Sequence, residues 1–251
     1  MPKKIKKLQP EAFDLECSTV WSFPRRGNWA THDSKYRGNW SPDVVRNLLL
    51  RYSKEGDWVM DPMIGGGTTA VECKLLHRHL IAFDVNPIAI VRTQDAVDFE
   101  HETLAKLILE LDDAREAMKK VKTESIDFIL HHPPYADIIK YSEGKIPEDL
   151  SNIHDIDAFA DEMEKIAKEC YRTLKKGNFC AVLIWDTRRQ KMYQPMAFKV
   201  MERFLRVGFS LKEDIVKVQH NCKATWYWKT NSEKYNFLLI MHEHLFIFQK
   251  V

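Results

Sequence analysis

Short apolar runs alternate with amphipathic stretches along the chain, a pattern typical of an α/β domain. Five of these runs are short enough for buried strands, at residues 57–60, 80–83, 107–111, 126–130 and 179–185. Two more strands are expected towards the end, at residues 215–218 and 237–241. Residues 244–248 either continue the second of these or pair beside it.

Helical periodicity appears between the strands. It predicts helices over residues 42–52, 68–76, 158–174 and 196–207. Ser41 is expected to cap the first helix, which begins with Pro42, and Gly208 to end the last. We expect a turn at residues 176–178. Polar residues then cluster directly after strand ends, where ligands bind in open α/β sheets.

Composition adds few constraints. The 251 residues suit one domain, and a net charge of +2 neither demands nor excludes a nucleic-acid partner. No apolar run is long enough for a membrane span or signal peptide, and five scattered cysteines without CxxC indicate a reducing cytoplasm. Residues 1–17 form a basic arm, interpreted either as a frayed terminus or as a phosphate contact.

The strongest local motif is VMDPMIGGGTTAVE, at residues 59–72. A strand delivers Asp61 to the edge of the sheet. The three following glycines, at 65–67, let the backbone turn tightly and approach a ligand without obstruction by side chains. A P-loop would need a Lys-Ser/Thr pair after the last glycine, and a dinucleotide loop would need GxGxxG. Neither pattern is present.

Acidic residues end or follow the next two strands. Asp84 ends the second strand, where a carboxylate can accept hydrogen bonds from ribose hydroxyls. Its alternative role is to cap the next helix, and both roles can hold together. Asp113 follows the third strand, and we interpret it either as a contact to an adenine amino group or as a solvated helix cap.

A second strong motif, IDFILHHPPY, occupies residues 126–135. Its prolines lack N–H donors, so carbonyls of this loop are free to point at a substrate. An amino group that attacks a methyl sulfonium needs hydrogen-bond acceptors and a flat aromatic surface that holds its base. His132, the Pro133 carbonyl and Tyr135 supply these parts. The alternative is a rigid Pro-Pro loop with a packed tyrosine.

The two motifs resemble those of the prokaryotic N4-cytosine/N6-adenine DNA amino-methyltransferases. The glycine segment is similar to the family's S-adenosylmethionine (AdoMet) motif, DPF-x-G-x-G-T-T. HPPY resembles the catalytic motif, which begins with Asp, Asn or Ser. The lead-in KYRGNWSPDVVRNLLLRYSKEGDWV, the turn RTLKKGNF and the ending MHEHLFIFQK also resemble family segments. The resemblance covers most of residues 18–251.

This resemblance implies a Rossmann-like AdoMet-dependent methyltransferase fold, with a mainly parallel seven-stranded sheet, an antiparallel C-terminal strand and helices on both faces. It implies AdoMet as cofactor and double-stranded DNA with a flipped base as substrate. The expected cofactor contacts are Tyr36, Asn39, Trp40, Ser41, Asp61, Pro62, Gly65, Gly67, Thr68, Thr69, Asp84 and Asp113. The expected catalytic residues are His132, Pro133, Pro134 and Tyr135.

His132 departs from the family pattern. A neutral imidazole accepts one hydrogen bond through one nitrogen, where a carboxylate accepts more. The family guide, Ser for cytosine and Asp or Asn for adenine, therefore fails, and the target base stays open. Met63 and Gly66 also vary the AdoMet loop, but neither change is expected to abolish binding.

Within residues 18–251 we expect no large separate target-recognition domain. We expect a single catalytic domain with small target-contacting insertions near residues 136–157 and 219–236. The second insertion interleaves lysines with aromatic residues, which suits phosphate contact and base stacking, although a β-hairpin with surface aromatics is the alternative. The candidate DNA contacts are Arg25, Arg26, Trp29, Tyr141, Lys223, Trp226 and Trp228.

The expected reaction is direct attack of the amino nitrogen, with no covalent enzyme intermediate and no metal. His242 and His244 alternate in a strand and are interpreted as structural. An RNA amino-methyltransferase acting on guanine N2 of tRNA is one alternative. A nucleic-acid-binding protein with a degenerate site, suggested by His132, is another. The sequence gives neither the recognition site, nor a partner restriction enzyme, nor the oligomeric state, for which a homodimer is open.

Overall fold

The computed structural model describes residues 5, 7–36, 38–136, 139–221 and 225–251. Its strands are β1 (Val20–Ser22), β2 (Trp58–Asp61), β3 (His79–Asp84), β4 (Leu107–Leu111), β5 (Ile126–His131), β6 (Leu174–Ile184), β7 (Thr187–Arg189), β8 (Met192–Gln194), β9 (Ser210–Val218) and β10 (His242–Gln249). Its helices are α1 (Pro42–Tyr52), α2 (Thr68–Leu75), α3 (Pro87–Val97), α4 (Ala114–Ala117), α5 (Ile156–Thr173), α6 (Met196–Val207) and α7 (Thr225–Tyr235), with 3-10 turns at Met118–Lys120 and Leu150–Asn152.

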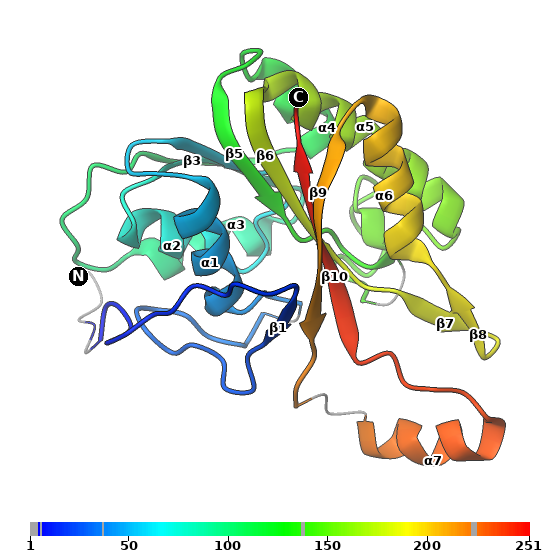
Figure 1. The fold of residues 1–251 in the computed structure, drawn as a ribbon. Coiled ribbons are helices and arrows are strands. Elements are labelled where there is room, and N and C mark those ends of the chain that lie inside the picture. Colours follow the sequence, from blue (N-terminus) through cyan, green and yellow to red (C-terminus); the bar gives the residue numbers. More distant parts are fainter. Residues whose placement is uncertain (1–4, 6, 37, 137–138, 222–224) are drawn as a thin grey trace.

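Eight strands form one sheet in the order β1-β9-β10-β6-β5-β2-β3-β4 (Figure 1). Neighbouring strands are parallel except at β10, which runs antiparallel to both β6 and β9. The prediction of a mainly parallel sheet with an antiparallel C-terminal strand is confirmed. The number seven is one too few, because β1 adds an edge strand that pairs with residues 216–218 of β9. No prediction included β1.

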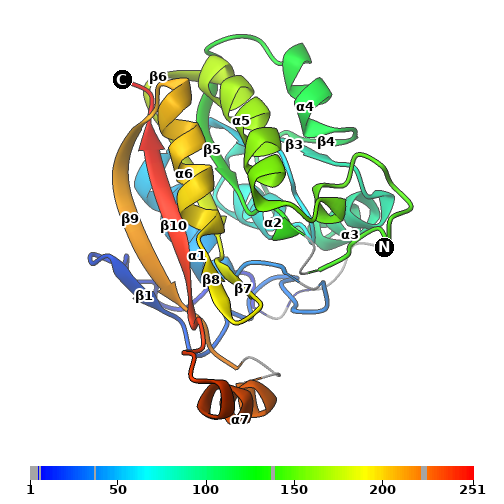
Figure 2. The same cartoon turned by 90° about the vertical axis from the view of Figure 1, so that its right-hand side faces the viewer.

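Helices cover both faces of the sheet, with α1, α2 and α3 on one side and α4, α5 and α6 on the other (Figures 1 and 2). Side chains of each strand alternate between the two hydrophobic cores. On β6, Ala181 and Leu183 pack in the core with α1, whereas Cys180 and Val182 pack in the core with α5. The polar strand ends are therefore left at the edge of a closed, two-sided core.

The predicted strand at residues 237–241 is wrong. These residues have no regular structure, and the last strand, β10, begins only at His242. The hairpin alternative for residues 219–236 is also wrong, because this segment contains the helix α7. Figure 1 shows α7 away from the sheet, so its aromatic residues have no neighbouring strand to pair with. A helix satisfies its backbone hydrogen bonds locally.

Three local expectations also need correction. Residues 176–178 do not separate α5 from a strand, because they lie within β6, where Gly177 adopts φ 85° and donates its N–H to the Lys250 carbonyl. Ser41 precedes α1, but its hydroxyl donates to Asp43 Oδ2 at 2.5 Å instead of capping the helix. Asn86, and not Asp84, caps α3.

A buried carboxylate ties the N-terminal segment to the helices. Glu72 on α2 is fully buried. Its oxygens pair with Trp29 Nε1 at 2.6 Å, His32 Nε2 at 2.7 Å and Arg46 Nε at 2.8 Å. The described part of the predicted basic arm packs beside this group, where Arg46 also donates to Gln9. Among the described residues, no helix combines the length and apolar character needed to cross a membrane.

We predict that Glu72→Ala lowers the free energy of unfolding by about 3 kcal/mol, because it leaves the Arg46 guanidinium buried without its partner. Urea denaturation followed by circular dichroism measures the loss. Glu55→Ala, at an exposed position, is the control and should change stability little. Equal stability of the two variants would contradict the role given to Glu72.

Candidate active site

A pocket opens at the carboxyl ends of β2, β3 and β5. It encloses about 740 Å³ of empty space, its open mouth included. Both sequence motifs line it, the first through residues 62–66 and the second through His132 and Pro134. The lead-in segment, with Tyr36, Asn39 and Trp40, forms another wall. The structure thus brings together residues that are far apart in the sequence.

Asp61 holds the glycine loop from the inside. Its side chain is fully buried and accepts hydrogen bonds from the Met63 N–H at 3.0 Å and the Thr69 hydroxyl at 2.6 Å. Burial raises the pKa of Asp61 to about 7. Among the predicted cofactor contacts, Asp61 and Thr69 therefore shape the loop, whereas Pro62 and Gly65 face the pocket.

Gly66 is a site residue that the sequence reasoning missed. A Cβ atom at this position would lie 2.8 Å from Tyr36 Cβ and 2.9 Å from Asn39 Cγ. The lead-in segment can therefore close over the loop only because residue 66 has no side chain. The Thr68 hydroxyl fastens this contact by donating to Asn39 Oδ1 at 2.8 Å. The run of three glycines was the available signal.

Gly67 has a different role, since it precedes α2 in the left-handed conformation with φ 84°. A Cβ atom there would lie 2.8 Å from Thr93 Oγ1. Ser41, the remaining predicted contact in the lead-in, is buried and bonded to Asp43. Neither of these two predicted cofactor contacts lines the pocket.

Asp84 ends β3 and lines the pocket. Its Oδ2 accepts the Gly65 N–H at 2.9 Å and its Oδ1 accepts the Asn86 N–H at 2.9 Å. Burial raises the pKa of Asp84 to about 6, and these two hydrogen bonds only partly offset that effect. The carboxylate thus joins the glycine loop to the next strand and keeps acceptor capacity for a ligand.

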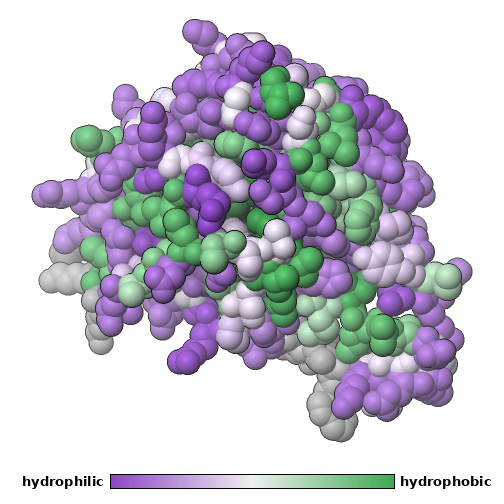
Figure 3. All heavy atoms as spheres, viewed as in Figure 1, coloured by the Kyte–Doolittle hydropathy of each residue, from purple (hydrophilic) through white to green (hydrophobic). Residues whose placement is uncertain are grey.

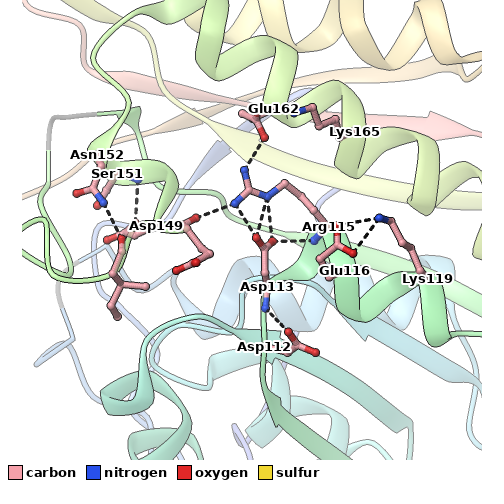
Figure 4. Close-up of polar contacts among 12 residues, drawn as sticks. Asp112, Asp113, Arg115, Glu116, Lys119, Asp149, Ser151, Asn152, Glu162 and Lys165 are labelled. Carbon is pink, nitrogen blue, oxygen red and sulfur yellow. Dashed lines mark hydrogen bonds and ion pairs between the residues drawn. The ribbon is translucent and has the colours of Figure 1, made fainter.

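Asp113 also lines the pocket, but its carboxylate is occupied (Figure 4). It caps α4 by accepting the Arg115 N–H, and both of its oxygens pair with the Arg115 guanidinium. The same guanidinium reaches Glu162 on α5 and the Glu148 carbonyl. The geometry favours the helix-cap interpretation of Asp113 over a direct adenine contact.

The Pro-Pro loop follows β5. His132 and Pro134 line the pocket, and the side chain of His132 is 9% exposed. Tyr135 is only 4% exposed, and its hydroxyl donates to Glu243 inside the protein. A base has no open face of Tyr135 to stack on, so this arrangement corresponds to the packed-tyrosine alternative. Glu243 itself was missed, because a buried acid in a terminal strand carries no catalytic spacing.

A pair of tyrosines stands at the pocket. The rings of Tyr36 and Tyr141 are nearly parallel, at 14°, with centroids 5.8 Å apart. Tyr141 was a predicted substrate contact and Tyr36 a predicted cofactor contact, and the structure places them side by side. Asn86, which the sequence reasoning missed, lines the same wall and donates to the Tyr141 carbonyl at 3.5 Å.

The other predicted DNA contacts lie in different surroundings. Trp29 is 4% exposed and bonded to Glu72, so we reassign it from DNA contact to the small core beside α2. Arg26 holds the lead-in by donating to the Asn39 and Asp33 carbonyls, while Arg25 is exposed. Lys223 and the side chain of Trp226 lie outside the described residues. Trp228 is 49% exposed on α7.

One group of three potential metal ligands occurs among the described residues. His131, Cys170 and Cys180 are fully buried between β5, β6 and α5, with their ligand atoms within 4.8 Å of one another. This group faces the helix side and not the pocket. The expectation that the reaction needs no metal stays a prediction.

The fold has known counterparts among solved structures. A solved structure of a SAM-dependent methyltransferase from Methanosarcina mazei superposes with a TM-score of 0.53, at 14% identity, over 81% of this chain and 97% of that one. The predicted methyltransferase fold is confirmed. The model of the DNA methylase family matches residues 2–93 and 126–251, so the chain belongs to that family.

Curated relatives include proteins named as type II methyltransferases. The chain is 24% identical to Type II methyltransferase M.BsoBI of Geobacillus stearothermophilus, over 80% of this chain and 44% of that protein. It is 28% identical to M.HpaI of Haemophilus parainfluenzae, over 64% of this chain and 49% of that protein. The chain thus spans about half the length of these relatives.

Proposed function

We propose that the chain transfers a methyl group from AdoMet to an exocyclic amino nitrogen of a base in DNA. The observation that carries this proposal is that the glycine loop and the Pro-Pro loop line one pocket. A cofactor on the first loop and a base at the second would meet there. Membership of the DNA methylase family and the names of the relatives support the same reaction.

The residues of the pocket fit AdoMet. Asp84 offers a carboxylate to ribose hydroxyls, and Gly65 and Gly66 present bare backbone. Tyr36 and Trp40 supply apolar surface across the pocket. When bound, AdoMet supplies an electrophilic methyl group. The protein's part is to hold the ribose, exclude water and orient the attacking nitrogen.

The proposed target is the N4 amino group of cytosine or the N6 amino group of adenine in double-stranded DNA. Either nitrogen lies inside the duplex, so the base has to flip out to reach the pocket. We propose that His132 and the Pro133 carbonyl accept hydrogen bonds from this amino group. Because Tyr135 is packed, the stacking surface has to come from the pocket mouth, where Tyr141 lies. A cytoplasmic location and a homodimer stay predictions.

The proposal is tested with AdoMet that carries a labelled methyl group, double-stranded DNA and tRNA, followed by mass spectrometry of the nucleosides. We expect label in DNA as N4-methylcytosine or N6-methyladenine. Transfer to tRNA alone would contradict the proposal. Binding of AdoMet and DNA without transfer to any polymer would instead favour a degenerate, binding-only protein.

Two substitutions of one residue provide the matched control. His132→Ala removes the acceptor and should reduce transfer by about 10²-fold or more. His132→Asn restores an acceptor that the family uses and should retain a larger share of the activity. An equal loss of methyl transfer in both variants would contradict the acceptor role and indicate that the His132 ring matters only for packing.

AdoMet affinity should depend on pH through Asp84. The carboxylate accepts ribose hydroxyls only when ionised, and its pKa is raised to about 6. Affinity is therefore nearly full at pH 7 and above and falls as the pH drops through 6, by about tenfold between pH 7 and pH 5. Isothermal titration calorimetry measures the profile. Asp84→Asn should bind more weakly with a flat profile, and a slope that persists in this variant would assign the titration to another group, such as Asp61.

The helix α7 is the proposed DNA-contacting element. It projects from the body beyond the ends of β9 and β10, and its surface mixes hydrophobic with hydrophilic side chains (Figures 1 and 3). Trp228 is half exposed, and Lys229 and Lys234 are exposed. Exposed aromatic rings among lysines suit stacking and phosphate contact. Lys191 on the turn between β7 and β8 lies 3.9 Å from the Tyr235 ring centroid and supports the helix there.

Removing both lysines, in Lys229→Ala/Lys234→Ala, should weaken DNA binding at all sequences. The slope of log affinity against log salt should fall in magnitude by about 2, because about one counterion contact is lost per lysine. Fluorescence anisotropy over a salt series measures both quantities. The matched control, Lys165→Ala/Lys168→Ala on α5, removes the same charge and should keep the wild-type slope. An unchanged slope in the α7 variant would remove α7 from the DNA interface.

A further inference from the structure

A chain of buried polar groups runs from the sheet to the pocket wall. Lys217 on β9 donates to Glu243 Oε2 on β10 at 2.7 Å, and the Tyr135 hydroxyl donates to Glu243 Oε1. His132 Nε2 contacts the same Tyr135 hydroxyl. Tyr135 and Glu243 are each 4% exposed, and the Lys217 side chain is 18% exposed. Three separate parts of the sequence, the Pro-Pro loop, β9 and β10, therefore contribute to one connected network.

The charges decide the direction of these hydrogen bonds. Burial disfavours ionisation of Glu243, but the Lys217 ammonium and the hydrogen bonds from Lys217 and Tyr135 outweigh burial and hold the pKa of Glu243 below its ordinary value. Its carboxylate can then only accept. Burial and Glu243 raise the pKa of Tyr135 well above its ordinary value, so the phenol keeps its proton and gives it to Glu243. The phenol oxygen is left as an acceptor.

The state of His132 follows. Burial lowers the pKa of His132 to about 4, although Glu243 opposes this effect, so the ring is neutral at pH 7. The Tyr135 hydroxyl already donates its proton to Glu243. In the hydrogen bond between His132 and Tyr135, His132 Nε2 therefore has to be the donor and the Tyr135 oxygen the acceptor. In a neutral imidazole, a hydrogen bond made by one nitrogen sets the state of the other. The lone pair then resides on Nδ1.

We propose that Lys217, Glu243 and Tyr135 are positioning residues that fix His132 in its Nε2–H tautomer, so that Nδ1 is the acceptor for the amino group of the target base. The inference rests on the proposed function and deepens it. The family motif places Asp, Asn or Ser at this position, each with an oxygen acceptor that needs no tautomer. A histidine presents a reliable acceptor only if its tautomer is fixed.

The same network handles the proton of the reaction. In the proposed transfer, the amino nitrogen would form a bond to the methyl carbon while the bond from that carbon to the sulfonium sulfur breaks, its electron pair returns to sulfur, and S-adenosylhomocysteine leaves. The nitrogen then carries one proton too many. The proton passes from the nitrogen to His132 Nδ1, which leaves a neutral methylated base and an imidazolium. The imidazolium donates through Nε2 to Tyr135, whose hydroxyl donates to the negative Glu243. Release of the Nδ1 proton to water restores the neutral ring.

The tautomer is measured directly on the whole chain without substrate. Histidine is labelled with ¹⁵N in both ring nitrogens, and two-bond ¹H–¹⁵N spectra are recorded at pH 7. The signals of His132 are assigned by their loss in His132→Asn. We expect a protonated Nε2 and a bare Nδ1 in the wild type, and a mixture of tautomers in Tyr135→Phe. An Nδ1–H tautomer in the wild type, or an unchanged His132 spectrum in Tyr135→Phe, would overturn the proposal.

Kinetics provide the second readout. Tyr135→Phe and Glu243→Gln should each lower kcat on the order of 10²-fold, with KM for AdoMet unchanged. Tyr171→Phe makes the same chemical change on α5, where the ring packs edge-on against Phe209, and should keep the wild-type kcat. A wild-type kcat in Tyr135→Phe would contradict the network's role. The NMR measurement needs no methyl transfer. The tautomer can therefore be tested even if the methyl-transfer assay contradicts the proposed function, and the two failures can be told apart.

Discussion

The parallel pairing of β2 between β5 and β3 is the constraint on which the site depends. Met60 pairs with Ile129 on one side, and Asp61 pairs with Ala82 on the other. Parallel strands in register end at the same edge of the sheet, so the loops that follow them have to meet there. The glycine loop, Asp84 and the Pro-Pro loop therefore share one pocket, although a helix or a longer crossover separates each from the next.

Close packing and charge pairing then set the details of this edge. The lead-in segment approaches the loop so closely that residue 66 has to be glycine. Behind the pocket, two buried carboxylates are each matched by a cation, Glu72 by Arg46 and Glu243 by Lys217. A buried carboxylate without such a partner would be strongly destabilising. One pair anchors the N-terminal segment, and the other reaches the catalytic motif, so structural and chemical roles rest on the same kind of interaction.

Two parts of the molecule have different roles in the proposed function. The sheet and its helices supply a methyltransferase fold and the pocket, and the chain belongs to the DNA methylase family. The helix α7 stands outside this body and offers exposed lysines and aromatic rings (Figure 1). The substrate contacts proposed here lie on two small elements, α7 and the segment around Tyr141.

The sequence by itself determined the fold class, most strands and helices, and the two motifs of the site, because these depend on local periodicity and short spacings. It failed where the outcome depends on distant neighbours. Residues 237–241 read as a strand, but in the folded chain they have no regular structure and belong to no strand. Tyr135 read as a stacking surface, but Glu243, far away in sequence, draws its hydroxyl inward. Only the tertiary structure brings Lys217 of β9 and Glu243 of β10 to Tyr135 and His132, and the tautomer proposed for His132 depends on these contacts.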